Sequence, residues 1–567
     1  MRDEDSGRSY SLWVLVLCLA VCLTGIFDRD LWTPDEPRDA AVALRMSRTG
    51  NLIVPYLGVK PFVEKPPLAF AASAGVARAL GPVLGDTAAI RLMSALWGLG
   101  TLGMLYLLAR RLLGASPAFL AVILLATMAG FVENFHWIRV DPALSFFVAA
   151  AVWSFGEFYF GEVRWQCVSA GLFTACSFLA KGPIGPALVG TAWLGMIVSW
   201  LNRQWRQTGR IRLHPGWHLS CLAAFALPAA AWMILFRVHA GAQLWNEWFW
   251  VNQAGRFSGT TPELGHLTTG DPLFYMKAAA LYTLPWFPGI LIWLWSVLRE
   301  VRHCPIPPAR MFPLIWIVAA TALLSVSVTK REIYIAPLLP AFAMMCADAF
   351  ESGLPKWADV FFAAWSWLAV AVTGLLALSP LWVSLLPASM PTDSRAFLGA
   401  FSVRHLVAAA GCVASAWLIL RGRRASGILR FVAVTAILYV GLLAVGGEAM
   451  DRAKTMGPRI GAFASRIPAE RRPRVVGWRF SETTAACFDY YCAWAVPQLE
   501  DETRLDDILA GRDPEFDSVI IDQSRPVPDL SSQPHRVLAE GHLGWAAGKR
   551  GMAWIEGAPP PRVRVGL

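Results

Sequence analysis

Long apolar runs alternate with short polar segments along most of the chain. A helix needs roughly 20 mainly apolar residues to cross the hydrocarbon core of a bilayer. About thirteen runs approach this length: 10–27, 88–108, 117–133, 142–160, 165–180, 183–200, 216–236, 273–298, 311–329, 332–350, 358–384, 403–420 and 427–446. This pattern predicts a polytopic α-helical membrane protein. No small-residue cleavage motif follows the first run, so we interpret it as a span and not as a signal peptide.

The pattern changes at about residue 447, where long apolar runs end. The tail is polar and contains three short β-like runs, RVVGW (474–478), SVIID (518–522) and MAWIE (552–556). We therefore predict a transmembrane domain over 1–446 and a small soluble α/β domain over 447–567. Cys487 and Cys492 fall in this tail, where an oxidising compartment permits a disulfide. Their close spacing would close only a tight loop, so the bridge stays an open alternative.

Basic residues in the short loops indicate the orientation. They concentrate in alternate loops, at 110–111, 164, 203–212, 299–302 and 421–424. Cytoplasmic loops carry an excess of Lys and Arg, so we predict that these loops and the N-terminus are cytoplasmic. An odd number of spans then places the tail and the first long loop (28–86) outside. In a bacterial inner membrane, that side is the periplasm.

The composition agrees with a membrane protein. Of 567 residues, 56% are hydrophobic and 16% are charged, whereas a soluble domain has about 25% charged residues. The net charge of +10 is explained by anionic lipids of the inner leaflet and by phosphate ligands. No nucleic-acid partner is predicted, and the sequence does not indicate an oligomeric state.

The first outer loop contains two predicted helices. Residues 35–49 have helical spacing of apolar and basic positions, which is typical of an amphipathic helix on a membrane surface. Pro66 and Pro67 precede a second apolar segment, and proline suits the first turn of a helix. We therefore predict helices over 35–49 and 67–80, with Glu64 and Lys65 at the turn before the second.

Polar clusters collect in the predicted outer loops. Each member has an ordinary explanation: Asp35 and Glu36 could cap a helix, Arg139 and Asp141 could form an ion pair, and Lys181 could extend to the interface. However, charged groups near the bilayer are costly and are usually paired or functional. Together the clusters predict a cationic pocket for a lipid phosphate, with carboxylates as base or metal ligands. Its members would be Lys65, Lys181, Arg256, Lys330, Arg331, Asp35, Glu64 and Asp141.

Seven segments carry a resemblance to a known family. They are PDEPRDAAVALRMSRTGNLIVP (34–55), FVEKPPL (62–68), RVDPAL (139–144), FLAKGPIG (178–185), WVNQAGRF (250–257) followed by GHLTTGDPLFYM (265–276), LPWFPG (284–289), and TKREIYIAPLLPAFA (329–343). In their order and spacing, the chain resembles the C-type membrane glycosyltransferases of the aminoarabinose transferase and protein O-mannosyltransferase superfamily. The resemblance covers most of the chain and implies a GT-C fold.

The resemblance also implies a polyprenyl-phosphate sugar donor and an outer active site. By position, it implies catalytic roles for Asp35 and Asp141, with Glu36 as a further candidate. It implies donor binding by Lys65, Lys181 and Arg256, and further candidates in the same segments are Arg38, Arg139, Lys330 and Tyr334.

A divalent metal (Zn, Mg or Mn) is the cofactor that the resemblance raises. Glu64 matches an acid proposed as a ligand, and His266 is a second candidate. The family often has Glu-His where this chain has Asn252 and Gln253, and Gln is a poor zinc ligand. The presence of a metal is therefore left open.

Three functions remain at this point. The first is inverting transfer of a sugar from an undecaprenyl-phosphate donor to lipid A or a similar glycolipid, and the second is transfer to a protein hydroxyl. The third, from another class, is a transporter of lipid-linked sugars, although no repeat typical of transporters is visible. For a hydroxyl acceptor, we favour Asp35 as the base, because a mobile surface helix would carry it while Asp141 would pair with Arg139.

Overall fold

The computed structural model describes most of the chain. Not described are residues 1, 33, 212–213, 256–257, 259–270, 303–305, 352, 388–389, 391, 422–426, 524–527, 529, 531–534, 543–550 and 558–567. Two of the predicted site residues, Arg256 and His266, therefore lie outside the described residues.

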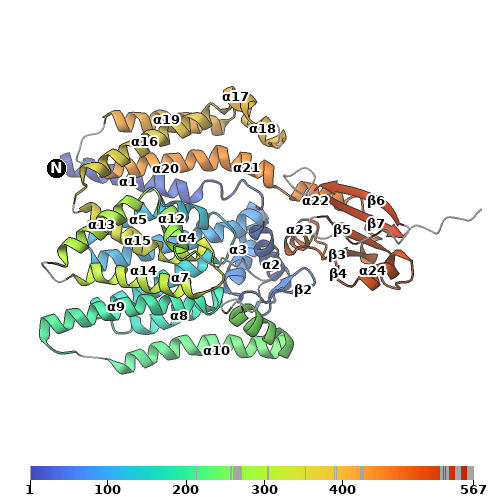
Figure 1. Cartoon of the computed structure of the whole chain (residues 1–567), viewed down its shortest axis with the longest axis horizontal. Coiled ribbons are helices and arrows are strands. Elements are labelled where there is room, and N and C mark those ends of the chain that lie inside the picture. Colours follow the sequence, from blue (N-terminus) through green and yellow to red (C-terminus); the bar gives the residue numbers. More distant parts are fainter. Residues whose placement is uncertain are drawn as a thin grey trace, which may run out of the picture.

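The first two thirds of the chain form a bundle of helices (Figure 1). Its helices are α1 (Arg2–Leu23), α2 (Asp35–Thr49), α3 (Leu68–Leu84), α4 (Asp86–Leu112), α5 (Ala115–Ala126), α6 (Ala129–Phe135), α7 (Asp141–Phe160), α8 (Gln166–Lys181), α9 (Ile184–Thr208), α10 (Pro215–Asn246), the π-helical η1 (Glu247–Gly255), α12 (Phe274–Tyr282), α13 (Phe287–Glu300), α14 (Pro308–Val326), the 3₁₀-helical η3 (Glu332–Leu338), α15 (Leu339–Glu351) and α16 (Lys356–Ala377). A short hairpin of β1 (Tyr56–Leu57) and β2 (Lys60–Pro61) precedes α3.

The remaining elements lead into the tail. They are α17 (Ser379–Trp382), η4 (Val383–Leu385), α18 (Thr392–Leu398), α19 (Val403–Arg421), α20 (Gly427–Gly441), η6 (Leu442–Gly446), α21 (Gly447–Lys454), α22 (Gly457–Ala464), η7 (Arg472–Arg474), β3 (Val475–Trp478), α23 (Glu482–Cys492), β4 (Gln498–Leu499), α24 (Glu502–Leu509), β5 (Ser518–Asp522), β6 (His535–His542) and β7 (Gly551–Gly557).

Each of the thirteen predicted apolar runs coincides with a helix or a bent pair of helices. Within the described residues, eight helices are long and apolar enough to cross a membrane, or up to ten if each bent pair counts as one span. The bent pairs are α5 with α6, at 63°, and α12 with α13, at 115°. The other three runs lie in α1, α8 and α14. The prediction of a polytopic helical fold is therefore confirmed.

The tail folds into a five-stranded mixed sheet with the order β4-β3-β5-β7-β6. Strands β4, β3 and β5 are parallel, and β7 is antiparallel to both β5 and β6. The three β-like runs of the sequence are β3, β5 and β7. Cys487 and Cys492 are both free cysteines, so the bridge left open by the sequence is not present.

Helix α2 lies between the bundle and the sheet (Figure 1). Its predicted boundaries are confirmed, and it ends at Gly50, whose φ of 71° suits the left-handed conformation that closes many helices. Its apolar face is covered largely by protein. Ten of its residues are buried, and it packs against α3, α4 and α23. An apolar helix face can be covered by protein as well as by lipid, so the pattern alone did not distinguish the two.

The sheet domain is attached to α2 by polar contacts from α23. Arg38 of α2 donates to Glu482 at 2.6 Å, and Asp489 lies 3.5 Å from Arg45. Asp489 also accepts the backbone N–H of Gly58 at 3.2 Å. Tyr490 joins the apolar cluster that contains most of α2. The tail and the first outer loop therefore share one packed core at the same end of the bundle.

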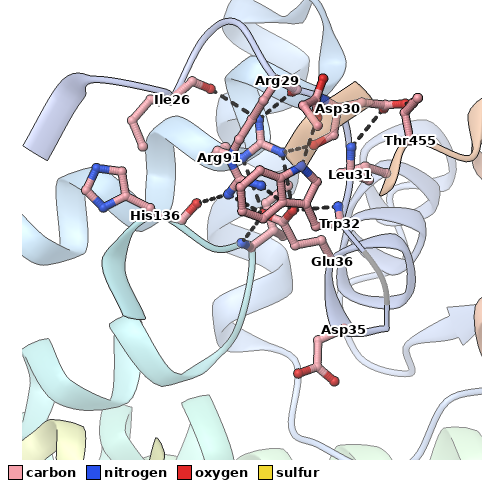
Figure 2. Close-up of polar contacts among 12 residues, drawn as sticks. Ile26, Arg29, Asp30, Leu31, Trp32, Asp35, Glu36, Arg91, His136 and Thr455 are labelled. Carbon is pink, nitrogen blue, oxygen red and sulfur yellow. Dashed lines mark hydrogen bonds and ion pairs between the residues drawn. The ribbon is translucent and has the colours of Figure 1, made fainter. Parts of the chain in front are cut away.

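Glu36 anchors the start of α2 in a buried network (Figure 2). Its carboxylate accepts hydrogen bonds from Arg29 at 2.8 and 3.0 Å, from Arg91 at 3.3 Å and from the backbone of Trp32 and Ile138. Burial alone would raise the pKa of the Glu36 carboxyl, but Arg91, Arg29 and the two backbone N–H groups lower it. The network joins α2 to α4 and to the segment before α7.

We predict that Glu36→Gln destabilises the protein by about 3–5 kcal/mol, because removing one partner leaves Arg29 and Arg91 as uncompensated buried charges. Thermal unfolding of the purified protein measures the change. Glu500→Gln is the control, since Glu500 forms an ion pair with Lys60 in which both side chains are more than half exposed. Equal melting temperatures for the two variants would contradict a stabilising role for the Glu36 network.

Candidate functional site

A cavity of about 520 Å³ lies where α2, the loop before α3, the start of α7 and the α8–α9 junction meet. The described lining contains four carboxylates and four cationic side chains, which face several apolar residues. The charged residues are Asp35, Asp39, Glu64, Asp141, Lys65, Arg139, Lys181 and Arg331, and the remainder are Pro183, Ile184, Ala187, Phe249, Asn252, Gln253, Ala254, Leu323, Leu324, Ser327, Thr329, Ile333 and Tyr334.

Asp35 binds three arginines from three parts of the chain. Its carboxylate lies 2.7 Å from Arg38, 3.1 Å from Arg139 and 3.3 Å from Arg331. Burial alone would raise the pKa of the Asp35 carboxyl, but the charges of these arginines and of Lys65 hold it well below its usual range. Asp35 is therefore a strongly held anion that fixes two guanidinium groups in the cavity.

Arg139 does not have the partner that the sequence predicted. It pairs with Asp35 and not with Asp141, and its guanidinium lies 4.1 Å from the ring of Trp137. Asp141 instead forms an ion pair with Lys181. The expectation that Asp141 would be held by Arg139 while Asp35 stayed available is therefore wrong. Side chains two residues apart near a helix start point in different directions.

Lys181 lies at the end of α8, just before Gly182. Its ammonium group lies 4.6 Å from the ring of Tyr334, within cation–π distance. Gly182 has a φ of 80°, and a Cβ there would come within 2.8 Å of Gln253. The KGP segment therefore turns sharply beneath η1 and directs Lys181 into the cavity. Lys181 and Tyr334, predicted separately from the sequence, are brought together here.

Asp39 is a cavity residue that the sequence analysis missed. Its carboxylate accepts from the Lys65 ammonium at 3.1 and 3.4 Å. The signal was present in the sequence, because residues four apart share a helix face and Asp39 follows Asp35 by four positions in a predicted helix. The loop before α3 supplies Lys65, as predicted.

The other predicted residues have different positions. Glu36 belongs to the buried network and does not line the cavity, and its neighbour Asp35 points away from that network (Figure 2). Arg38 lies beside the cavity, between Asp35 and Glu482. Lys330 is not part of the described lining, although Thr329 and Arg331 on either side of it are.

Glu64, the first predicted metal ligand, lies near an arginine and a glutamine. Its carboxylate lies 4.0 Å from Arg38, and its backbone carbonyl accepts from the Gln253 amide at 3.2 Å. In the part of the chain that the structure describes, no three His, Cys, Asp or Glu side chains are grouped as metal ligands. His266, the other predicted ligand, lies outside the described residues, so the metal stays a prediction and we derive no step through it.

The cavity lining combines charged and apolar residues. Beside the eight charged groups, it includes Ile184 and Ala187 of α9 and Leu323 and Leu324 of α14. Helices α9 and α14 pack against each other. A lining with both charged and apolar residues fits an amphipathic ligand, that is, an anionic head group on a hydrocarbon chain.

Comparisons with known proteins agree with this arrangement. The model of the family described as dolichyl-phosphate-mannose-protein mannosyltransferase matches residues 64–234. Proteins named undecaprenyl phosphate-alpha-4-amino-4-deoxy-L-arabinose arabinosyl transferase are similar to this chain. The one from Shewanella sediminis is 29% identical over 360 residues, with 61% of each chain covered. The one from Aeromonas salmonicida is 29% identical over 389 residues, covering 65% of this chain and 66% of the relative. The match thus spans less than two thirds of these relatives' lengths.

The fold matches a solved structure over nearly the whole chain. ArnT from Cupriavidus metallidurans in the apo state has a TM-score of 0.72 at 20% identity, with 97% of this chain and 98% of ArnT covered. The same protein bound to undecaprenyl phosphate has a TM-score of 0.70. The predicted resemblance to the C-type membrane glycosyltransferases is therefore confirmed, and this chain has the GT-C fold.

We predict that Lys181→Met weakens binding of a lipid phosphate by about 1.5–3 kcal/mol, the value of a charge-assisted hydrogen bond. Titration of the purified protein with undecaprenyl phosphate measures this loss. Lys60→Met is the matched control, because Lys60 is half exposed and pairs with Glu500 outside the cavity. If both variants bound equally well, Lys181 would be a lysine that serves only to neutralise Asp141.

Proposed function

We propose that this protein is an inverting membrane glycosyltransferase. It transfers a sugar from undecaprenyl phosphate, or a similar polyprenyl phosphate, to lipid A or a related glycolipid. The observation that carries this proposal is the cavity, whose lining contains both paired lysines and arginines and apolar residues of α9 and α14. The relatives named as arabinosyl transferases, and the ArnT structure with undecaprenyl phosphate, support the same class of donor.

The donor's phosphate binds to the cationic residues of the cavity, and its polyprenyl chain contacts the apolar residues of α9 and α14. The acceptor oxygen attacks the anomeric carbon of the sugar, and the bond from that carbon to the phosphate oxygen breaks. The electron pair of that bond leaves with the polyprenyl phosphate. Lys65 and Lys181 stabilise the charge that develops on this leaving group, since a fixed cation in a site with little water acts strongly on a developing charge.

The carboxylates have different roles in this reaction. The three arginines around Asp35 weigh against a base role, because a carboxylate with a depressed pKa is a weak proton acceptor. We assign Asp35 to positioning Arg139 and Arg331. Asp141 pairs with Lys181, which the donor phosphate also attracts. If the acceptor is a hydroxyl, Asp141 takes its proton. An acceptor phosphate is already ionised and needs no base.

One observation favours a second candidate function. The matching family model is described as a protein mannosyltransferase and covers the segment with the Lys65 and Lys181 motifs. The acceptor would then be a protein hydroxyl, and the donor chemistry would be unchanged. The two functions differ only in the acceptor.

We propose that the protein lies in the bacterial inner membrane, with the cavity and the sheet domain in the periplasm. The basic loops support this orientation, because they precede or follow helices at the opposite end of the bundle from α2 and the sheet (Figure 1). Membrane lipids and the polyprenyl donor are the partners that this placement implies.

The proposed function is tested by mass spectrometry of lipid A and membrane glycolipids from cells with and without the gene. We expect a species that is heavier by one sugar only when the gene is present, and its loss in Lys181→Met. The same cells are searched for glycosylated proteins. Sugar on proteins with unmodified lipids would favour the second function, and no change in either would contradict glycosyl transfer.

We predict opposite kinetic effects for the two aspartates. Asp35→Asn releases two arginines and raises the KM for the donor. With a hydroxyl acceptor, Asp141→Asn lowers kcat by about 10²–10⁴-fold, the usual contribution of a general base, and keeps or increases donor affinity. Steady-state kinetics with a synthetic donor gives both values. A collapse of kcat in Asp35→Asn at unchanged KM would restore Asp35 as the base.

A further inference from the structure

Asp39 and Lys65 form an ion pair that is already complete without a ligand. The Asp39 side chain is 3% exposed and the Lys65 side chain 15% exposed, and the ammonium lies within 3.4 Å of both carboxylate oxygens. Both residues line the cavity. The lysine that would hold a donor phosphate is therefore neutralised before any donor arrives.

Carboxylates and cations are equal in number in the described lining of the cavity. The described lining has four carboxylates and four cations, and the ion pairs connect Lys65 with Asp39, Lys181 with Asp141, and Arg139 and Arg331 with Asp35. A lipid phosphate that enters must therefore compete with carboxylates for cations. Among the described lining residues, the cations that it meets already have carboxylate partners.

Asp39 is better suited to such competition than Asp35. Asp35 is held by three guanidinium groups, whereas the hydrogen bonds recorded for Asp39 come from one flexible ammonium group. An ammonium is a compact charge on a long stem and turns easily from one anion to another. Burial raises the pKa of the Asp39 carboxyl, and the charge of Lys65 opposes this rise. The other charges that act on it are Arg38 and Asp35.

We propose that Asp39 is a positioning residue that competes with the lipid phosphate for Lys65, and that it thereby promotes release of the polyprenyl phosphate product. This inference rests on the proposed function. It assigns Asp39 a role that acts through Lys65, without contact with the reacting atoms.

The chemistry of the transfer explains why release needs such a competitor. In the donor, the phosphate is a diester with one negative charge. When the bond to the sugar breaks, the product is a phosphate monoester, whose second ionisation lies near pH 6. The product is therefore more negative than the donor at neutral pH and binds the lysines more strongly. Because the Asp39 carboxylate competes with the product phosphate for Lys65, it offsets this increase in product affinity.

The test compares binding of undecaprenyl phosphate to the purified full-length protein and to Asp39→Asn. We expect the variant to bind about tenfold more tightly, since the phosphate no longer displaces a charge-assisted hydrogen bond. In the transfer assay, kcat falls and product inhibition becomes stronger. Asp39→Glu, which keeps the carboxylate, restores wild-type affinity to within a few fold. Glu500→Gln removes a lysine partner outside the cavity and leaves affinity and kcat unchanged.

A double variant separates competition from general electrostatics. In a Lys65→Met background, Asp39→Asn has no effect on affinity, because the cation for which the anions compete is absent. Asp39→Ser serves as a second neutral variant and carries the same expectation as Asp39→Asn. Folding of each variant is checked by thermal unfolding.

Two results would overturn the inference. The first is equal or weaker binding of undecaprenyl phosphate by both folded neutral variants, and the second is failure of both to fold, which would make the pair purely structural. These results differ from failure of the proposed function, in which the wild-type protein itself would not bind undecaprenyl phosphate.

Discussion

Glu36 is fully buried, and its carboxylate binds Arg29, Arg91 and two backbone N–H groups at the start of α2. A buried carboxylate is tolerated only when its partners are complete, so this network fixes where α2 begins. Asp35 is the preceding residue and points the other way (Figure 2). The position of Asp35, and one helical turn later that of Asp39, follows from the anchoring of Glu36.

Pairing of charges is the rule on the cavity side of α2 as well. The cations that line the cavity are matched by carboxylates from other segments. Unpaired buried cations are costly, so these ion pairs stabilise the cavity lining. Under the proposed function, a lipid phosphate exchanges partners with these carboxylates.

The sheet domain also contributes to the position of α2. Helix α23 covers α2 with apolar contacts, and Glu482 binds Arg38, which in turn binds Asp35. The tail is thus packed against the helix that carries the site residues and is not an appendage. This explains why α2 is buried although its sequence has the pattern of a surface helix.

The sequence by itself determined the helices and the motifs. The thirteen apolar runs form helices or bent pairs of helices, because a backbone in a bilayer must satisfy its hydrogen bonds internally. A helix makes these bonds within its own segment of the chain, so the local sequence predicts it. The motifs around Lys65, Asp141 and Lys181 contain residues that line the cavity. Only the tertiary structure decided the partners: Arg139 with Asp35, Lys181 with Asp141, and Lys65 with the unpredicted Asp39. An ion pair forms between whichever opposite charges the packed helices bring within about 4 Å, and that distance depends on the whole bundle and not on neighbours in the chain.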